Sequence, residues 1–207
     1  MGKIYKWKID KICIYPFGGV SKFDEDINKP ISEEGMILVM GPFVQFVFLL
    51  FSLFLFKNTF FYTKILTYNL LLLIFNLLPI YPLDGGRILN LIFNKRNSYL
   101  KSFTFSFSLS FFLLFLLLLL SIYFEVFVSF LSIFSFLFFL LYQEWRKRKY
   151  YFNKFKLERF LHTYPFSKVK CVRRDKDMMR DKKHVFFFKG HYVSEKEYLK
   201  KMYKNYK

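Results

Sequence analysis

The uninterrupted apolar runs of this chain constrain its fold more than any other feature. Only Phe and Leu occupy Phe111–Leu120, and more Phe and Leu flank this run. A water-soluble domain of this length has no use for such a run, whereas a membrane-spanning helix needs about 20 mostly apolar residues. The composition agrees, since 54% of the 207 residues are hydrophobic and 32 are Phe. We therefore expect an all-α membrane protein.

Four apolar segments are candidates for spanning helices. A polar break at Lys57–Thr59 separates the first two segments, and Glu125 separates the last two. We predict a polytopic helix bundle with spans at about 35–56, 63–82, 103–124 and 126–142. These spans define a transmembrane core over 35–143. The core lies between a cytoplasmic or interfacial strand-like segment at 1–34 and a basic, soluble C-terminal tail at 144–207.

The basic residues lie mainly outside the apolar runs and predict the orientation. The formal net charge is +18, which fits a nucleic acid or an anionic membrane. No motif supports nucleic-acid binding, so we expect membrane lipid as a partner and no nucleic acid. Lys and Arg gather before the first span, at 84–101 and after the fourth span, whereas the opposite loops carry only Lys57, Lys64 and Glu125. The positive-inside rule therefore predicts that both termini are cytoplasmic.

The segment before the first span predicts a short β-hairpin. Apolar and polar residues alternate over 3–30 around the turn Pro16–Gly19. Ser32 is a candidate N-cap of the first span, with Glu33 and Glu34 in the first turn, where they face the helix dipole. A metal site at these two carboxylates is the alternative.

The tail after Trp145 is basic and aromatic. Its pattern predicts a helix followed by a small strand-and-helix unit. Cys13 and Cys171 lie near opposite ends of the chain in basic surroundings, and we interpret them as unrelated reduced thiols.

The most informative stretch is Asn76–Arg87, with the sequence NLLPIYPLDGGR. Pro79 and Pro82 cannot continue an ordinary helix and leave backbone carbonyls free. Gly85 and Gly86 permit backbone conformations that are closed to other residues. Irregular backbone at membrane depth is tolerated only where it is buried in protein or lines a polar cavity. We therefore predict a helix break that faces such a cavity.

Two side chains in this stretch are candidates for chemistry. An ionisable residue such as Asp84 costs roughly 2.5–3.5 kcal/mol at membrane depth unless something compensates it, and a metal ion is one such partner. The alternatives are that Asp84 caps a helix from Gly85 or pairs with Arg87. The amide of Asn76 can contact an extended peptide in the same cavity, or form a helix–helix hydrogen bond. The spacing leaves these alternatives open.

This stretch resembles the Asn-x-x-Pro-x-x-Pro-Leu-Asp-Gly-Gly signature of the site-2 protease family, peptidase family M50, and in particular its stage IV sporulation protein FB type. Shorter motifs follow the order of the family: Pro16–Gly19, Asn28–Glu34 and Gly41-Pro42, then a late aromatic hairpin and a basic segment. The resemblance covers roughly Trp7 to Phe160.

The resemblance implies an intramembrane zinc metalloprotease. In the family, about six transmembrane helices surround a zinc ion, and an early helix carries His-Glu-x-x-His, which supplies two ligands and the general base. The Asp of the later motif is the third protein ligand. Further implied partners are a membrane-associated protein substrate and regulatory membrane proteins. Carried onto this sequence, the family's roles are zinc ligand for Asp84, substrate binding for Asn76 and Pro79, and backbone structure for Gly85, Gly86, Gly18 and Gly19.

One part of the family pattern is missing from these 207 residues. They contain no His-Glu-x-x-His, so no catalytic general base is assigned. The family pattern places that motif just before Met1, which predicts a chain that is truncated or mis-started at its N-terminus. The histidines are His162, His184 and His191, all in the tail. We interpret them as solvated, with a surface metal site at His184 and His191 as the alternative.

Three functions remain open from the sequence. The first is an active intramembrane zinc metalloprotease, for which the sporulation branch implies a membrane-associated sigma-factor precursor as substrate. The second is a catalytically inactive membrane scaffold that binds clients of the family. The third is a small transporter or lipid-contacting protein, in which the polar residues of the spans line a path.

Overall fold

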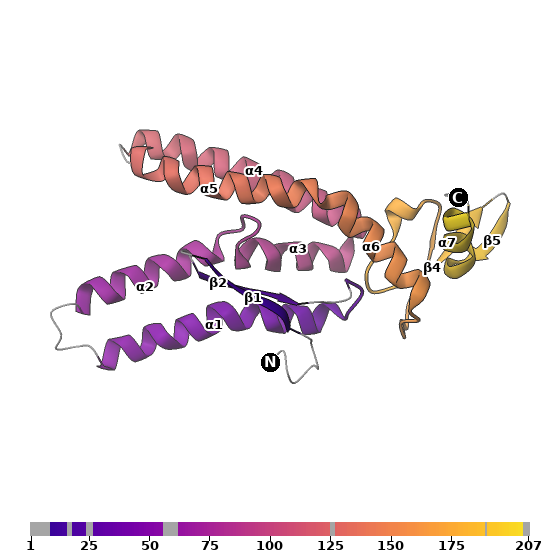
Figure 1. Cartoon of the computed structure of the whole chain (residues 1–207), viewed down its shortest axis with the longest axis horizontal. Helices are drawn as coiled ribbons and strands as arrows, with labels where there is room; N and C mark the ends of the chain where they lie inside the picture. The colour runs from indigo at the N-terminus through magenta and orange to yellow at the C-terminus, as the bar shows by residue number, and fades with distance from the viewer. Residues whose placement is uncertain are drawn as a thin grey trace.

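The computed structural model describes residues 9–15, 18–23, 27–55, 62–124, 127–188 and 190–204. Most of these residues are helical (Figure 1), as the predicted all-α class requires. The chain also contains a small three-stranded sheet near the C-terminus. The elements in chain order are β1 (Ile9–Tyr15), β2 (Gly18–Phe23), α1 (Ile31–Leu55), α2 (Tyr62–Leu77), α3 (Asp84–Arg96), α4 (Tyr99–Tyr123), α5 (Phe127–Arg146), α6 (Arg148–Leu161), β3 (Val169–Val172), the 3₁₀ helix η1 (Asp175–Asp177), β4 (Lys183–Phe188), β5 (His191–Ser194) and α7 (Glu195–Lys204).

Helices occupy all four segments that were predicted to cross the membrane. Two of them, at Ile31–Phe54 and Tyr99–Tyr123, are long and apolar enough to span it. α2 is shorter, with 16 residues, because Pro79 and Pro82 prevent it from continuing to residue 82. α5 has 20 residues and extends beyond the predicted end at 142.

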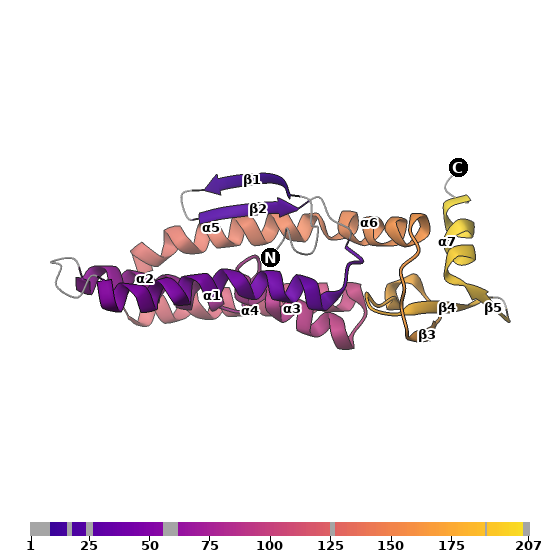
Figure 2. The same cartoon turned by 90° about the horizontal axis from the view of Figure 1, so that it is seen from below.

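The predicted hairpin is present as the antiparallel pair β1 and β2, which runs from Ile9 opposite Phe23 to Tyr15 opposite Gly18. In Figure 2 this pair lies to one side of the helices. Three other sequence features lie outside the described residues: the turn residues Pro16 and Phe17, the polar break Lys57–Thr59, and Glu125.

The helices pack in an order that places α3 at the centre. α1 contacts α2 and α3, α3 contacts α4, and α4 contacts α5. α4 and α5 form a long antiparallel pair, and α6 continues from α5 toward the C-terminal strands (Figure 1). The start of α3, where Asp84 lies, is therefore flanked by other helices.

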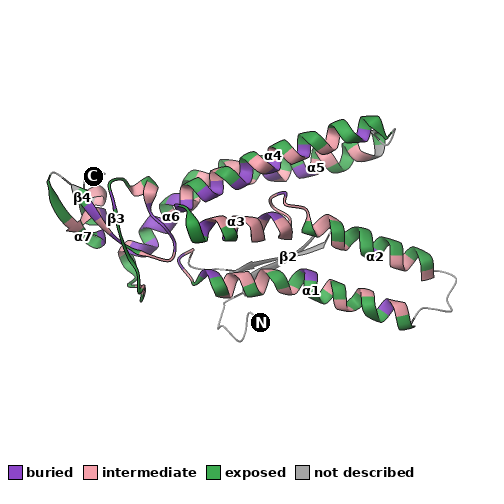
Figure 3. Cartoon of the chain, turned by 180° about the vertical axis from the view of Figure 1, so that it is seen from behind, coloured by how far each residue is buried: buried purple, intermediate pink, exposed green. Residues whose placement is uncertain are grey.

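The outer faces of the long helices are apolar and exposed. Only 11% of the most apolar window of α1, and 28% of that of α4, is buried inside the protein. Phe54 and Phe112 are 81% and 62% exposed, and Figure 3 shows exposed residues along most of α1 and α2. Water penalises so much exposed apolar surface, whereas lipid does not. The fold is therefore that of a membrane protein.

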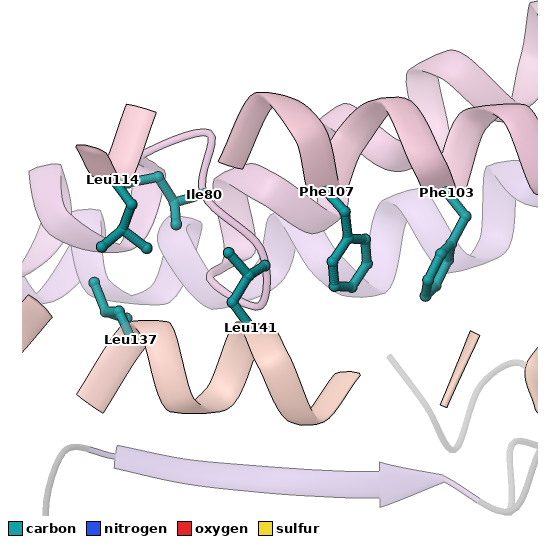
Figure 4. Close-up of a cluster of buried hydrophobic side chains, with 6 residues drawn as sticks. All are labelled: Ile80, Phe103, Phe107, Leu114, Leu137 and Leu141. Atoms are coloured by element: carbon teal, nitrogen blue, oxygen red, sulfur yellow. The ribbon is translucent and has the colours of Figure 1, made fainter. Parts of the chain in front are cut away.

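A buried apolar cluster joins α4 and α5 to the segment that follows α2 (Figure 4). Ile80 inserts its side chain between the two long helices and is 1% exposed, so the cluster anchors the backbone just before α3. Its buried members are Ile80, Phe103, Phe107, Leu114, Leu137 and Leu141.

The residues after α5 form a folded unit. β3 pairs parallel with β4, β4 pairs antiparallel with β5, and α7 packs against β4 and β5. This agrees with the predicted helix followed by strands and a helix. We call α6 together with residues 162–204 the C-terminal unit. A second apolar cluster joins it to the start of α4, and its buried members are Tyr99, Phe152, Phe155, Val172, Met178 and Phe186.

Candidate metal and substrate site

Between α2 and α3 the chain forms a tight turn that contains both Pro79 and Pro82. Inside this turn the amide of Ile80 donates to the carbonyl oxygen of Leu78 at 2.7 Å, and the amide of Leu83 donates to the carbonyl oxygen of Ile80 at 2.9 Å. These short-range bonds replace the helical pattern that the prolines prevent. The predicted helix break is therefore present, and its backbone is hydrogen-bonded and packed.

Two glycines let the first turn of α3 lie directly against this backbone. A Cβ added to Gly85 would overlap the carbonyl oxygen of Leu77, and a Cβ added to Gly86 would overlap the backbone of Ile80. A side chain at either position would push α3 away from the turn. Close approach of two backbones is therefore the physical reason for this glycine pair.

Asp84 is the first residue of α3, and its side chain is partly exposed. The N-cap is Leu83, and no side chain caps the helix, so the capping alternative is wrong. Within the described part of the chain, no hydrogen bond or ion pair joins the Asp84 carboxylate to Arg87 or to another residue. The partial positive charge at the N-terminus of α3 favours a carboxylate here.

α1 passes close to this carboxylate. A Cβ added to Gly41 would lie 3.1 Å from Oδ2 of Asp84, so the absence of a side chain lets the helix backbone approach. One turn further along α1, Gln45 accepts a hydrogen bond at Oε1 from Nδ2 of Asn76, at 3.1 Å. The helix–helix bond considered for Asn76 is therefore present. The same face of α1 contacts both Asn76 and Asp84.

A row of buried serines on α4 supports the other side of the turn. Ser110 accepts a hydrogen bond at Oγ from the amide of Tyr81, at 2.8 Å. Ser106 lies one turn earlier and accepts at Oγ from Nδ2 of Asn90 on α3, at 3.1 Å. Small polar residues allow close helix packing in membranes and supply hydrogen bonds across it. α4 therefore fixes both the turn and α3.

The structure brings most of the predicted site residues together around one turn. Asn76 precedes it on α2, Pro79 lies within it, and Asp84, Gly85 and Gly86 follow it. Gly18 and Gly19 instead begin β2, where they pair with Tyr15 and Ile14. The sequence reasoning missed Gln45 and Ser110. For Gln45 a signal was available, since it is an amide within an otherwise apolar run and lies four residues after Gly41.

The sequence model of peptidase family M50 matches residues 56–120, which include this turn and Asp84. The solved structure of the site-2 protease from Methanocaldococcus jannaschii is 30% identical to the chain. It matches with a TM-score of 0.55 over 69% of this chain and 68% of that one. The chain belongs to peptidase family M50. The resemblance inferred from the motif is therefore confirmed.

Curated relatives of this M50 chain agree with that assignment. Stage IV sporulation protein FB of Bacillus subtilis is 33% identical over 165 residues, which cover 75% of this chain and 56% of the relative. The zinc metalloprotease MJ0392 of Methanocaldococcus jannaschii is 41% identical over 111 residues, which cover 49% of this chain and 31% of the relative. The M50 chain thus spans roughly half of the first relative and a third of the second.

The described residues fit one ligand of a zinc site and not a complete site. A catalytic zinc typically has three protein ligands and one open position. Asp84 suits one of these places, because its carboxylate is partly exposed beside Gly41 and forms no ion pair with any described residue. However, no group of three His, Cys, Asp or Glu side chains that could hold a metal occurs in the described part of this M50 chain.

His184 is a buried structural residue, so its interpretation as a solvated histidine is wrong. It is 0% exposed, and its Nε2 accepts a hydrogen bond from the amide of Met179 at 2.9 Å. Its Nδ1 lies 3.3 Å from the Glu195 carboxylate. Burial lowers the pKa of His184 against the opposing effect of Glu195. Both ring nitrogens are engaged, which disfavours a metal site shared with His191, an exposed residue of β5.

Proposed function

We propose that this M50 chain acts in an intramembrane zinc metalloprotease of the site-2 type and that Asp84 is one of the zinc ligands. The observation that carries the proposal is the placement of this carboxylate. Two prolines and two glycines build a turn that holds Asp84 at the N-terminus of α3, with the backbone of α1 beside it. This arrangement presents an anionic oxygen while the surrounding helices remain apolar.

Asn76 and Gln45 are proposed to bind the backbone of an extended substrate. Nε2 of Gln45 is buried, and no acceptor for it is found among the described residues. A buried donor without an acceptor costs about 1–3 kcal/mol, and a substrate carbonyl oxygen would remove this cost. Pro79, in the turn that follows Asn76, is proposed to contribute to the same substrate site. The pair would hold the peptide next to Asp84.

The membrane topology is a further part of this proposal. We propose that α1, α2, α4 and α5 all cross the membrane, with both ends of the 207 residues in the cytoplasm. The similarity to stage IV sporulation protein FB supports a sporulation substrate, which we propose to be a membrane-associated sigma-factor precursor. Regulatory membrane proteins would be additional partners.

A second function, a catalytically inactive membrane scaffold, is favoured by a different observation. The 207 residues contain no His-Glu-x-x-His, and the described part holds no three-ligand group. Under this alternative the turn and the Asn76–Gln45 pair would bind a client peptide without cleaving it.

A cleavage assay on the native protein, purified from the cells that produce it, distinguishes the two functions. The purified protein and its Asp84→Asn variant would be reconstituted with a membrane-associated sigma-factor precursor. Asp177→Asn in η1 of the C-terminal unit is the matched control. We expect Asp84→Asn to lower cleavage by about 100-fold or more and the control to cleave normally. If Asp84→Asn cleaved the substrate as fast as the unaltered protein, Asp84 would have no role in the cleavage. Substrate binding without cleavage by the unaltered protein would favour the scaffold.

A further inference from the structure

A basic cavity lies where α4 meets the C-terminal unit. Its volume is about 410 Å³. One wall comes from the first turns of α4, including Lys101, Phe105 and Ser108, and the other comes from Arg174, Lys176 and Asp177 around η1. Since α4 is apolar and long enough to span a membrane from Tyr99 onward, the cavity lies at the end of this candidate span.

The charged side chains of the cavity are predominantly cationic. Lys101 and Arg174 are 70% and 71% exposed and lie 3.6 Å and 3.4 Å from the same carboxylate, that of Asp177. Lys176 adds a third cation. Three cations with one carboxylate leave an excess of two positive charges. Asp177 holds two of the cations in place, while most of their surface remains open to a ligand.

A second cavity extends this surface away from α4. It has a volume of about 470 Å³, shares Arg174 and Asp177 with the first cavity, and adds Lys170 and Arg173. Its lining is more polar than that of the first. Together, the two cavities therefore form one surface that is apolar on α4 and cationic on the C-terminal unit.

The apolar wall distinguishes this site from a general anion-binding surface. Phe105 is 51% exposed, and the same face of α4 continues toward the apolar middle of the helix. A ligand that satisfies the whole site carries a negative group beside the cations and a hydrocarbon chain along α4. Acidic phospholipids have both parts, and basic pockets beside transmembrane helices bind such headgroups.

We propose that this cavity binds one acidic phospholipid, with its phosphate between Lys101, Arg174 and Lys176 and an acyl chain along Phe105 and Ser108. The inference depends on α4 lying in a membrane and not on the protease activity. The bound lipid would join η1 to α4 across the boundary between membrane and water. The amide of Tyr99 already donates to the carbonyl oxygen of Met178 at 2.9 Å across this boundary.

Native mass spectrometry of the full chain tests the proposal. The protein would be released from bilayers of four parts phosphatidylcholine to one part phosphatidylglycerol, and the phosphatidylglycerol that it retains would be counted. We expect the double variant Arg174→Gln with Lys176→Gln to weaken retention of phosphatidylglycerol about 30-fold. This follows because each charge lost near a membrane surface weakens lipid binding roughly fivefold. Ser108→Trp fills the apolar side of the cavity without changing the charge, and we expect it to reduce retention as well.

The matched control removes two other exposed cations, Arg146 and Lys149, which lie near the end of α5. The pair Arg146→Gln with Lys149→Gln should retain phosphatidylglycerol normally. An equal loss in this pair would overturn the proposal, because lipid binding would then follow the overall charge and not the cavity. Retention of phosphatidylcholine as strongly as phosphatidylglycerol would also overturn it. Displacement of the lipid by millimolar inorganic phosphate would instead assign the cavity to a soluble anion.

Discussion

The helices α1–α5 and the C-terminal unit differ in the kind of polar group that they bury. In the helices, the buried polar groups are mainly serines and amides, and several of them bond one or two neighbours. Ser106 and Ser110, for example, donate to backbone carbonyls one turn earlier while accepting from Asn90 and the turn. The C-terminal unit instead buries an ionised group at its centre. Arg159 is 3% exposed and donates to partners from several segments.

The network around Arg159 connects residues far apart in the sequence. Its Nη1 lies 3.1 Å from Oε1 of Glu195 on α7, and its Nε donates to Oδ1 of Asn28 at 2.6 Å. Asn28 lies just before α1 and also donates to Oε2 of Glu158 at 2.9 Å. Arg180 adds a second link to this region, since its Nη2 lies 2.7 Å from Oε2 of Glu34 in the first turn of α1. The C-terminal unit therefore holds the start of the helix that passes Asp84.

This difference between α1–α5 and the C-terminal unit follows from the solvent around each part. The helices α1–α5 keep much of their apolar surface outside, so close backbone packing and single hydrogen bonds specify their arrangement. The small C-terminal unit lies outside the apolar helices and has only a modest apolar core, so a buried network of ion pairs and hydrogen bonds adds specificity. We therefore expect charge deletions to act most strongly in the C-terminal unit and steric changes to act most strongly around the turn.

The largest expected effect is the loss of the buried guanidinium. Arg159→Met removes the cation that pairs with Glu195 and the donor to several carbonyl oxygens. Removing one partner of a buried ion pair costs about 3–5 kcal/mol. Urea unfolding in detergent would measure the change, and hydrogen exchange would locate it in α6, β4 and α7. Arg174→Met is the control, because the Arg174 side chain is 71% exposed and its ion pair with Asp177 should contribute less than about 1 kcal/mol. Similar losses in both variants would contradict the distinction between the two halves.

A steric change at the turn should have the next largest effect. Gly85→Ala places a methyl group against the carbonyl of Leu77, and we expect a loss of about 1–3 kcal/mol. Gly35→Ala on α1 is the matched control, since its Cβ would lie 4.0 Å from Leu91 and alanine favours a helix. Thermal unfolding in detergent measures both. If Gly85→Ala were as stable as Gly35→Ala, the close approach of the two backbones would not be required.

The hydrogen bond between α4 and the turn should have a smaller effect. Ser110→Ala leaves the amide of Tyr81 without its acceptor, which costs about 1–2 kcal/mol when the group is buried. Ser135→Ala on α5 is the control, because this exposed serine bonds only the carbonyl of Leu131 in its own helix. Hydrogen exchange at Tyr81 should accelerate in the first variant and stay unchanged in the second. Unchanged exchange in both would show that other contacts hold the turn.

Acidification should lower the stability of the C-terminal unit and leave that of α1–α5 unchanged. Burial holds the pKa of His184 below its ordinary value of 6.5, so below that pH the unfolded ring gains a proton that the folded ring does not. Burial favours a raised pKa for Glu195, but the hydrogen bond from His184 and the charge of Arg159 outweigh it and hold the pKa below 4.5. His184 therefore destabilises the folded unit as the pH falls below 6.5, and Glu195 adds to this loss only below 4.5.

We expect a loss of about 1 kcal/mol between pH 7.5 and pH 5, measured by hydrogen exchange in β4 and α7. His184→Gln should flatten this dependence in that interval, because the ring is its main source there. A wild-type unit with constant stability across the interval would rule out the lowered pKa of His184 as a source of acid sensitivity.

Local sequence signals predicted the features that depend on neighbouring residues. The apolar runs predicted the four helix positions, and Pro79, Pro82 and the two glycines predicted the break before α3. The features that the sequence missed depend on contacts between distant segments. Gln45 meets Asn76 across 31 positions, and His184 is buried because Arg159 and Glu195 surround it. No local pattern marks such pairs, because they form only when the helices and strands have packed.

The zinc content of the native protein, purified from the cells that produce it, tests the central claim most directly. Elemental analysis would compare the unaltered protein, Asp84→Asn and the control Asp177→Asn after identical purification. With Asp84 as a ligand, the unaltered protein and the control should hold zinc near one ion per chain, and Asp84→Asn should hold at least about tenfold less. Equal zinc in Asp84→Asn, or no zinc in the unaltered protein, would contradict the assignment of Asp84 as a zinc ligand.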